Sequence, residues 1–147
     1  MKSFKIVTGE RGEGKTTYIL SHFAHYKGYV TVHRNDEYFL KDLETKEETL
    51  LLSRHPVFNE AWKGRYINSS TFSKANDKLL SFNDTKVVLD EVGMLEVEGG
   101  GFATFLKKAP LMDIDLVISV RREFIMEVKN KFFPSITPDI ISVDRFL

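Results

Sequence analysis

A glycine-rich segment near the start of the chain, between Gly9 and Thr16, most constrains the fold. It fits the pattern G-x-x-x-x-G-K-[ST] at every fixed position, with a short apolar run before it and a helix-like segment after it. In such a turn the backbone N–H groups point inward at a phosphate chain, and the following helix adds the positive end of its dipole. The sequence therefore predicts a strand, a phosphate-binding loop (Walker A) and a helix, in that order.

The residues of this loop have predicted parts in holding a nucleoside triphosphate and its Mg²⁺. Lys15 is expected to reach the β- and γ-phosphates, and Thr16 to offer its hydroxyl to the metal. Arg11 either lies over the phosphates or faces solvent. The predicted nucleotide-binding residues are Gly9, Glu10, Arg11, Gly12, Glu13, Gly14, Lys15, Thr16 and Thr17.

Two adjacent carboxylates, Asp90 and Glu91, end a later apolar run, as in a Walker B strand. Mg²⁺ prefers oxygen ligands and usually keeps several waters, so Asp90 is predicted to hold the metal together with Thr16. Glu91 is placed to polarise an attacking water as a general base. The alternative is that both carboxylates are ordinary surface residues.

A pair of arginines, Arg121 and Arg122, follows a further apolar run. Ligands of open α/β sheets bind outside the carboxyl ends of the strands. One of the two is therefore predicted to stabilise charge on the γ-phosphate during the reaction. The alternative is a solvated or salt-bridged surface arginine. The predicted catalytic residues are Lys15, Glu91, Arg121 and Arg122.

Apolar runs alternate with helix-like segments along the chain, which predicts an α/β fold. Strands are expected at residues 4–7, 29–32, 66–68, 86–89, 115–120 and 140–143. Helices are expected at residues 17–26, stopped by Gly28; after Ser69 or Ser70; and in two segments that end at Pro110 and Pro134. A hairpin turning at Thr45-Lys46 is expected between residues 36 and 54, and loop at residues 57–65. The sheet should be mainly parallel with helices on both faces plus this antiparallel hairpin, in a single domain over residues 1–147.

Composition narrows the class of protein. The 147 residues are 42% hydrophobic, enough for one core, and Lys plus Arg balance Asp plus Glu at 21 each. This balance argues against non-specific nucleic-acid binding but leaves room for a local basic patch. With no cysteine, thiolate metal sites are excluded, and the four histidines form no convincing ligand set. No apolar run approaches the roughly 20 residues that cross a membrane, so we expect a cytoplasmic protein. Separately, we expect a monomer.

These segments resemble the small P-loop nucleoside-triphosphatase family, also described as thermophile-type or cancer-related nucleoside-triphosphatases. The resemblance covers most of the chain and is carried by the loop at residues 8–17, by the sequence VVLDEVGMLE at residues 87–96 and by Gly64-Arg65-Tyr66. The hairpin and Asp144-Arg145 add weaker matches. The chain departs from the family pattern at residues 29–38, which are shorter, and at Lys46, where glycine is usual. The resemblance implies a RecA-like P-loop fold and slow hydrolysis with broad base tolerance.

The residues together predict Mg²⁺-dependent hydrolysis of ATP, GTP or another nucleoside triphosphate to the diphosphate and phosphate. Two alternatives remain open. One is a nucleotide or nucleoside kinase, which would usually carry an arginine-rich lid that the sequence does not reveal. The other is a nucleotide-responsive binding module that acts with a partner. Trp62 and Tyr66 are candidates to stack on a nucleobase, against the more common role of packing.

Overall fold

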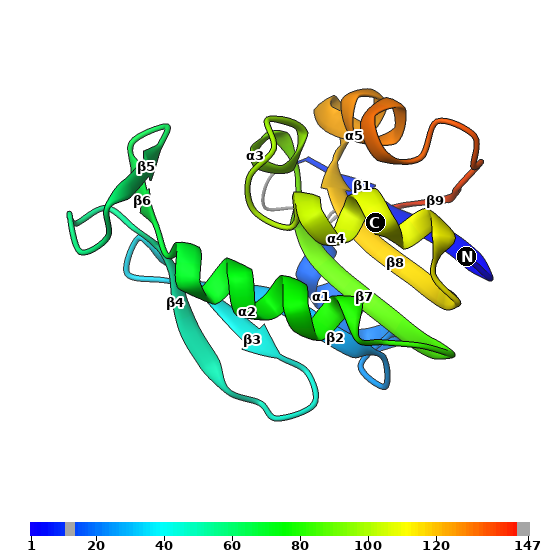
Figure 1. Cartoon of the computed structure of the whole chain (residues 1–147), viewed down its shortest axis with the longest axis horizontal. Helices are drawn as coiled ribbons and strands as arrows, with labels where there is room; N and C mark the ends of the chain where they lie inside the picture. The colour runs from blue at the N-terminus through cyan, green and yellow to red at the C-terminus, as the bar shows by residue number, and fades with distance from the viewer. Residues whose placement is uncertain (11–13, 144–147) are drawn as a thin grey trace.

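The structure is a computed structural model of the chain and describes residues 1–10 and 14–143. Its helices are α1 (Lys15–His22), α2 (Ser69–Leu80), α3 (Met94–Val97), α4 (Ala103–Lys108) and α5 (Ile125–Phe132), with short 3₁₀ turns at Ala109–Leu111 and Arg122–Phe124. Its strands are β1 (Ser3–Gly9), β2 (Lys27–Arg34), β3 (Glu37–Asp42), β4 (Glu48–Ser53), β5 (Glu60–Trp62), β6 (Arg65–Ile67), β7 (Thr85–Val92), β8 (Ile114–Arg121) and β9 (Asp139–Ser142). They form one mixed sheet in the order β5-β6-β4-β3-β2-β7-β8-β1-β9 (Figure 1).

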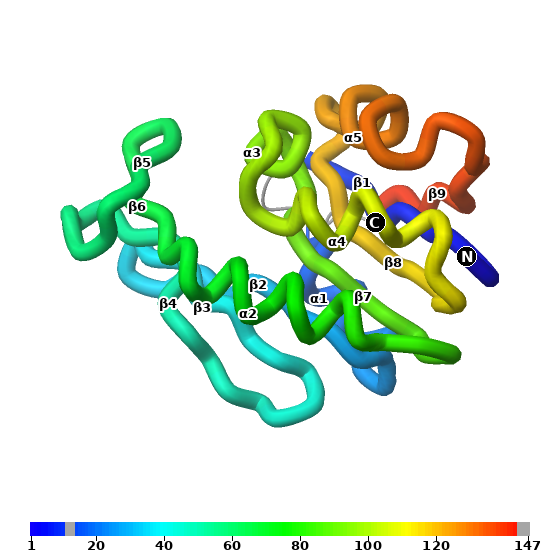
Figure 2. Tube along the Cα trace, in the orientation of Figure 1, coloured from blue at the N-terminus to red at the C-terminus, as the bar shows by residue number. Residues whose placement is uncertain are grey.

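The sheet has a parallel part and an antiparallel part. Strands β2, β7, β8, β1 and β9 pair in parallel. From β2 outward, β3, β4, β6 and β5 pair antiparallel, and Figure 2 shows β5 and β6 at the far end from β1 and β9. The predicted hairpin is confirmed as β3 and β4. The antiparallel part is larger than expected, however, because residues 57–65 are not all loop: β5 lies within them and β6 begins at Arg65.

Helices cover both faces of the parallel part, as predicted. Side chains of a strand alternate between faces, and neighbouring residues of the central strands enter different clusters. Val87 and Leu89 pack in the larger cluster under α2, α4 and α5, whereas Val88 packs in the smaller cluster with Ile19 of α1. In Figure 1, α2 and α4 lie in front of the sheet and α1 lies behind it.

Gly28 is not the helix stop that the sequence indicated. Helix α1 already ends at His22, and Gly28 lies inside β2, opposite Val88 of β7. Its φ is +121°, and a Cβ atom there would lie 2.0 Å from the carbonyl oxygen of Val88. Glycine is needed at this position because two backbones approach closely, a reason that local sequence does not reveal.

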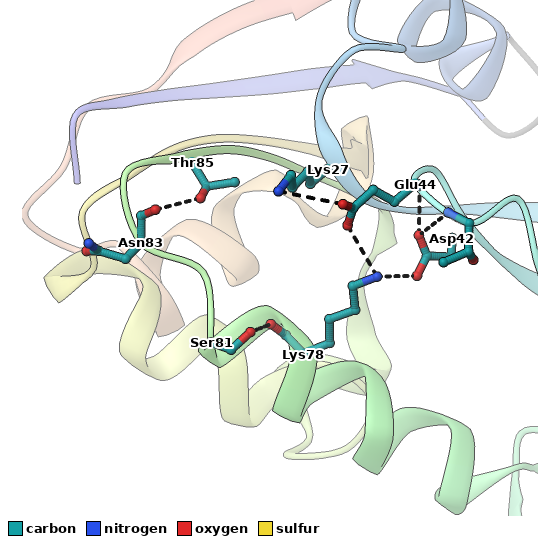
Figure 3. Close-up of polar contacts among 8 residues, drawn as sticks. Lys27, Asp42, Glu44, Lys78, Ser81, Asn83 and Thr85 are labelled. Atoms are coloured by element: carbon teal, nitrogen blue, oxygen red, sulfur yellow. Dashed lines mark hydrogen bonds and ion pairs between the residues drawn. The ribbon is translucent and has the colours of Figure 1, made fainter.

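The hairpin turn between β3 and β4 forms without glycine. Lys46 takes a positive φ of 68°, and the Asp42 carboxylate accepts hydrogen bonds from the backbone N–H groups of Glu44 (2.8 Å) and Thr45 (3.2 Å). Lys78 of α2 donates to the same carboxylate at 2.6 Å, and Figure 3 shows it between Asp42 and Glu44. Burial opposes ionisation of Asp42, but these hydrogen bonds outweigh it and lower its pKa. The network ties the hairpin to α2.

Helix α2 begins at a different cap from the one predicted. Helix α2 is capped by Asn68, whose side chain accepts from the N–H of Thr71 at 3.2 Å, and not by Ser69 or Ser70 as predicted. In the described part of the chain, no helix combines the length and the apolar character that crossing a membrane requires.

Candidate active site

The predicted site residues come together where neighbouring parallel strands end. Strand β1 ends at Gly9 directly beside Arg121, the last residue of β8. Asp90 and Glu91 lie near the end of β7, which pairs with β8 on its other side. Three strand ends and the start of α1 therefore converge at one edge of the sheet, as open α/β sheets favour for ligand sites.

Thr16 and Asp90 are in direct contact. The Thr16 hydroxyl donates a hydrogen bond to Asp90 Oδ2 at 2.6 Å, although 74 residues separate the two in the chain. Thr16 lies in the first turn of α1, and Asp90 is 1% exposed. The contact joins the start of α1 to the acidic end of β7.

Asp90 is held in place by two further groups that the sequence analysis did not single out. The hydroxyl of Ser119 donates to Asp90 Oδ1, and the backbone N–H of Thr31 donates to Oδ2 at 3.2 Å. Ser119 is fully buried in β8 between apolar neighbours. A single hydroxyl inside an otherwise apolar strand was the available signal, because buried polar groups are almost always hydrogen-bonded.

Lys15 is buried and folds back over the start of the loop. It is 8% exposed, and its Nζ donates to the carbonyl oxygens of Glu10 (2.9 Å) and Gly9 (3.4 Å). Gly14 precedes it as the N-terminal cap of α1, with a φ of 86° that suits glycine. Lys15 thus bridges the two described ends of the loop. The predicted binding residues Arg11, Gly12 and Glu13 lie outside the described residues, as do Asp144 and Arg145.

Thr17 is the one loop residue, among those described, that does not join this group. It is exposed on α1, and its backbone carbonyl accepts a hydrogen bond from the Ser21 hydroxyl at 2.9 Å.

Glu91 lies in a bulge of β7. Pairing with β8 runs from Leu89–Ile118 to Val92–Val120, so β7 carries one extra residue. Glu91 has a φ of 60°, which is uncommon for a residue other than glycine, and its N–H donates to Ser119 Oγ at 2.7 Å. Strained backbone of this kind is often found at functional sites. The bulge directs Glu91 into the cavity that Lys15 also lines.

The two predicted arginines have different surroundings. Arg121 lines the cavity with Lys15 and Glu91, and its Nη1 lies 4.0 Å from Glu123 Oε1. Arg122 instead forms an ion pair with Glu10 of the loop, with 2.9 Å between Nη1 and Oε1. Arg121 is thus the one of the two arginines that lines the cavity, and Arg122 contacts Glu10.

The cavity has a volume of about 480 Å³ and extends well beyond Lys15. Its other end is formed by five residues of the antiparallel part and its connections: Tyr38, Arg54, Trp62, Lys63 and Arg65. None of the three cations was predicted as a site residue, although Arg65 belongs to the Gly64-Arg65-Tyr66 segment of the resemblance. Lys63 and Arg65 belong to the β5–β6 hairpin and Arg54 follows β4, and the fold brings all three to the cavity that Lys15 lines.

Glu96 closes the wall of the cavity behind Glu91. Its side chain accepts from the backbone N–H of Gly93 at 2.8 Å and of Phe102 at 3.1 Å, which fixes the segment around α3. It is 2% exposed, and burial raises the pKa of its carboxyl to about 7, against the opposing effect of these hydrogen bonds. Glu96 thus fixes the segment that follows Glu91 and lines the same cavity.

The donor set at Thr16 and Asp90 fits Mg²⁺ better than a metal held by protein ligands alone. A hydroxyl and a carboxylate are hard oxygen donors, and Mg²⁺ is commonly bound by one or two of these plus phosphates and waters. No group of three or more His, Cys, Asp or Glu side chains that could hold a metal occurs within residues 1–10 and 14–143. The chemistry at this point therefore suits a metal that arrives with a phosphate ligand.

Comparison with known proteins supports the fold. No protein-family model matches the sequence, and no curated protein matches it. The crystal structure of THEP1 from the hyperthermophile Aquifex aeolicus superimposes with a TM-score of 0.68 at 17% identity, over 98% of this chain and 90% of that one. The solution structure of a human cancer-related nucleoside triphosphatase gives 0.65 at 17% identity, over 97% and 88%. The resemblance to the small P-loop nucleoside-triphosphatase family is confirmed at the level of the fold.

Proposed function

We propose that this protein is a P-loop nucleoside-triphosphatase of RecA-like fold that hydrolyses nucleoside triphosphates in the presence of Mg²⁺. The observation that carries the proposal is the hydrogen bond between Thr16 and Asp90. The short distance supports the proposal, because a hydroxyl and a carboxylate that lie 2.6 Å apart can share one hydrated cation. The fold shared with a human nucleoside triphosphatase supports the same reading.

The loop residues bind the substrate. Backbone N–H groups from Gly9 to Thr16 hold the phosphates, at the N-terminus of α1 where the helix dipole favours anions. Lys15, which now donates to the carbonyls of Glu10 and Gly9, turns to the β- and γ-phosphates when a triphosphate enters. Thr16 and Asp90 hold the Mg²⁺, which supplies charge neutralisation on the phosphate oxygens.

Glu91 and Arg121 act on the reacting phosphate. The Glu91 carboxylate accepts the proton of the attacking water, and Arg121 stabilises negative charge that develops on the γ-phosphate. Both side chains line the same cavity as Lys15, which supports these assignments. Arg122 is assigned to the loop instead, because it pairs with Glu10.

Slow turnover and broad base tolerance are also part of the proposal, as is a single functional unit over the whole chain. The continuous sheet from β5 to β9 supports the single unit. An arginine that is correctly placed contributes about 10³–10⁵ in rate in related enzymes. Arg121 lies 4.0 Å from Glu123 and 5.9 Å from the ring centroid of Phe124, and competition of Glu123 with a phosphate for its guanidinium would slow hydrolysis.

The experiment that tests this function is a phosphate-release assay with ATP, GTP, CTP and UTP, each with Mg²⁺ and with a chelator. We expect release from all four, only when Mg²⁺ is present, and loss of triphosphate binding in Lys15→Ala. Thin-layer analysis of the products separates hydrolysis from the kinase alternative, since a kinase would transfer labelled phosphate to an added nucleotide. Absence of phosphate release by the unmodified protein would contradict the proposed function.

A further inference from the structure

The cavity differs in charge from the chain as a whole. Acidic and basic residues balance over the sequence. Among the described residues that line the cavity, five are cations and two are carboxylates: Lys15, Arg54, Lys63, Arg65 and Arg121 against Glu91 and Glu96. A triphosphate at the loop would use Lys15 and Arg121. It would leave the other three cations without an anionic ligand.

These three cations share their end of the cavity with two aromatic rings. The guanidinium carbon of Arg65 lies 4.8 Å from the ring centroid of Tyr38, and Lys63 Nζ lies 4.9 Å from that of Trp62. Tyr38 also stacks on His33, with 4.4 Å between the ring centroids, so Trp62 is the ring better placed to accept a base. Cations next to aromatic faces are the combination that binds nucleotides, because the base stacks while the phosphate pairs with the cation. We refer to Tyr38, Arg54, Trp62, Lys63 and Arg65 as the aromatic–cationic end.

The two arginines at this end are only weakly compensated by the described part of the protein, and one carboxylate, Glu98, accepts a hydrogen bond from Trp62 Nε1 at 3.3 Å. Arg54 Nη2 lies 3.8 Å from the Asp36 carboxylate, in a pair whose side chains are 60% and 62% exposed. Arg65 donates to the backbone carbonyl of Asp36, which carries no net charge. An exposed pair at this distance contributes little, so a phosphate that approaches Arg54 displaces little.

We propose that the aromatic–cationic end binds a second nucleotide, beside the triphosphate held at the loop. The proposal rests on the proposed function, since it takes the loop end to be occupied by a triphosphate. The base of the triphosphate itself is a poorer fit to this end, because a base carries no negative charge for three cations to meet.

The ligand is a nucleoside monophosphate or the phosphorylated end of a single strand, which share one base and one phosphate. Trp62 is the one tryptophan in the sequence and therefore reports directly on stacking. The protein is saturated with a non-hydrolysable triphosphate and Mg²⁺, then titrated with AMP and, separately, with a 5′-phosphorylated DNA tetranucleotide. We expect quenching of Trp62 fluorescence by at least one of them.

The two titrations separate the two sources. Half-quenching by AMP at a concentration similar to or lower than that of the tetranucleotide assigns the site to a free nucleotide. Half-quenching by the tetranucleotide at a concentration at least tenfold lower assigns it to a strand end. No quenching by either ligand overturns the proposal. It is also overturned if the triphosphate analogue quenches Trp62 and blocks the second ligand, because the base of the triphosphate then occupies this end.

Variants test the cations. Arg54→Ala should raise the half-quenching concentration about tenfold and leave phosphate release unchanged, since Arg54 directly follows β4 and has no part in the proposed binding or hydrolysis of the triphosphate. Lys107→Ala on α4, an exposed cation that lines neither cavity, should change nothing. An unchanged affinity in Arg54→Ala overturns the proposal. Phosphate release is measured on the same samples, because its absence would contradict the proposed function without bearing on the second site. The titration is also repeated without triphosphate, which shows whether the second ligand binds when the loop end is empty.

Discussion

The Thr16 hydroxyl and the Asp90 carboxylate lie 2.6 Å apart, so two segments distant in the chain meet at a single hydrogen bond. Asp90 is buried and also accepts from Ser119 and Thr31, which leaves it little freedom to move. A carboxylate fixed in this way can hold a ligand in only one place. Removing the Thr16 hydroxyl is therefore the most direct test of whether the two side chains hold a metal together.

Thr16→Ala should raise the Mg²⁺ concentration for half-maximal hydrolysis by about ten- to a hundredfold, the usual cost of losing a group that holds or orients a metal ligand. Thr16→Ser keeps the hydroxyl and should stay close to the unmodified protein. Both are measured as phosphate release against Mg²⁺ concentration. An identical Mg²⁺ dependence in Thr16→Ala would show that the hydroxyl has no part in metal binding.

Glu91→Gln should lower kcat by about 10²–10⁴-fold with little change in nucleotide affinity, because the amide cannot accept a proton from water. Glu127→Gln on α5, which is exposed and outside the cavity, serves as the control. Steady-state hydrolysis gives kcat, and a fluorescent triphosphate gives affinity. If Glu91→Gln hydrolyses at the parent rate, the general base lies elsewhere.

Glu96 should make the stability of the protein fall as the pH rises. Its pKa is raised from 4.5 to about 7 in the folded protein, so the folded state favours the protonated carboxyl. The stability associated with this protonation is complete below about pH 4.5 and is lost between there and about pH 7, a change of about 3 kcal/mol.

Urea unfolding of the protein and of Glu96→Gln, each at pH 5 and pH 8, measures this effect. Glutamine cannot accept both backbone hydrogen bonds, so the variant should be less stable at pH 5, and its deficit should shrink at pH 8. Glu47→Gln, an exposed residue of the hairpin turn, should show no such change. A deficit that is equal at both pH values would contradict the raised pKa.

Gly28→Ala should destabilise the fold by at least about 2 kcal/mol, since its Cβ would meet the Val88 carbonyl oxygen at 2.0 Å and its φ is positive. Gly99→Ala is the matched control, because its φ is also positive, at 97°, but nothing lies within 4 Å of the added Cβ. The control should lose only about 1 kcal/mol. Chemical denaturation of both variants gives the comparison, and equal losses would mean that the close approach of β2 to β7 is unimportant.

The turn between β2 and β3 has a local sequence signal that the predicted elements did not include. Strand β2 continues past Val32 to Arg34 and turns into β3 through Asn35 and Asp36, both with positive φ. A two-residue turn with two positive φ angles is a hairpin signal, and asparagine and aspartate tolerate that conformation. The predicted hairpin instead begins at residue 36, and the turn at Asn35 and Asp36 was not predicted.

The amino-acid sequence by itself determined the strand before Gly9, the existence of a helix after Gly14, and the residues that end the apolar strands β7 and β8. This holds because each depends on neighbours along the chain: glycine spacing, apolar runs and the residue that follows a strand. Only the tertiary structure decided that Ser119 supports Asp90 and that Gly28 lies against Val88. It also decided that Arg54, Lys63 and Arg65 share a cavity with Lys15. These relationships arise from pairing between distant segments, and the order of residues within any one segment does not specify which partner it will meet.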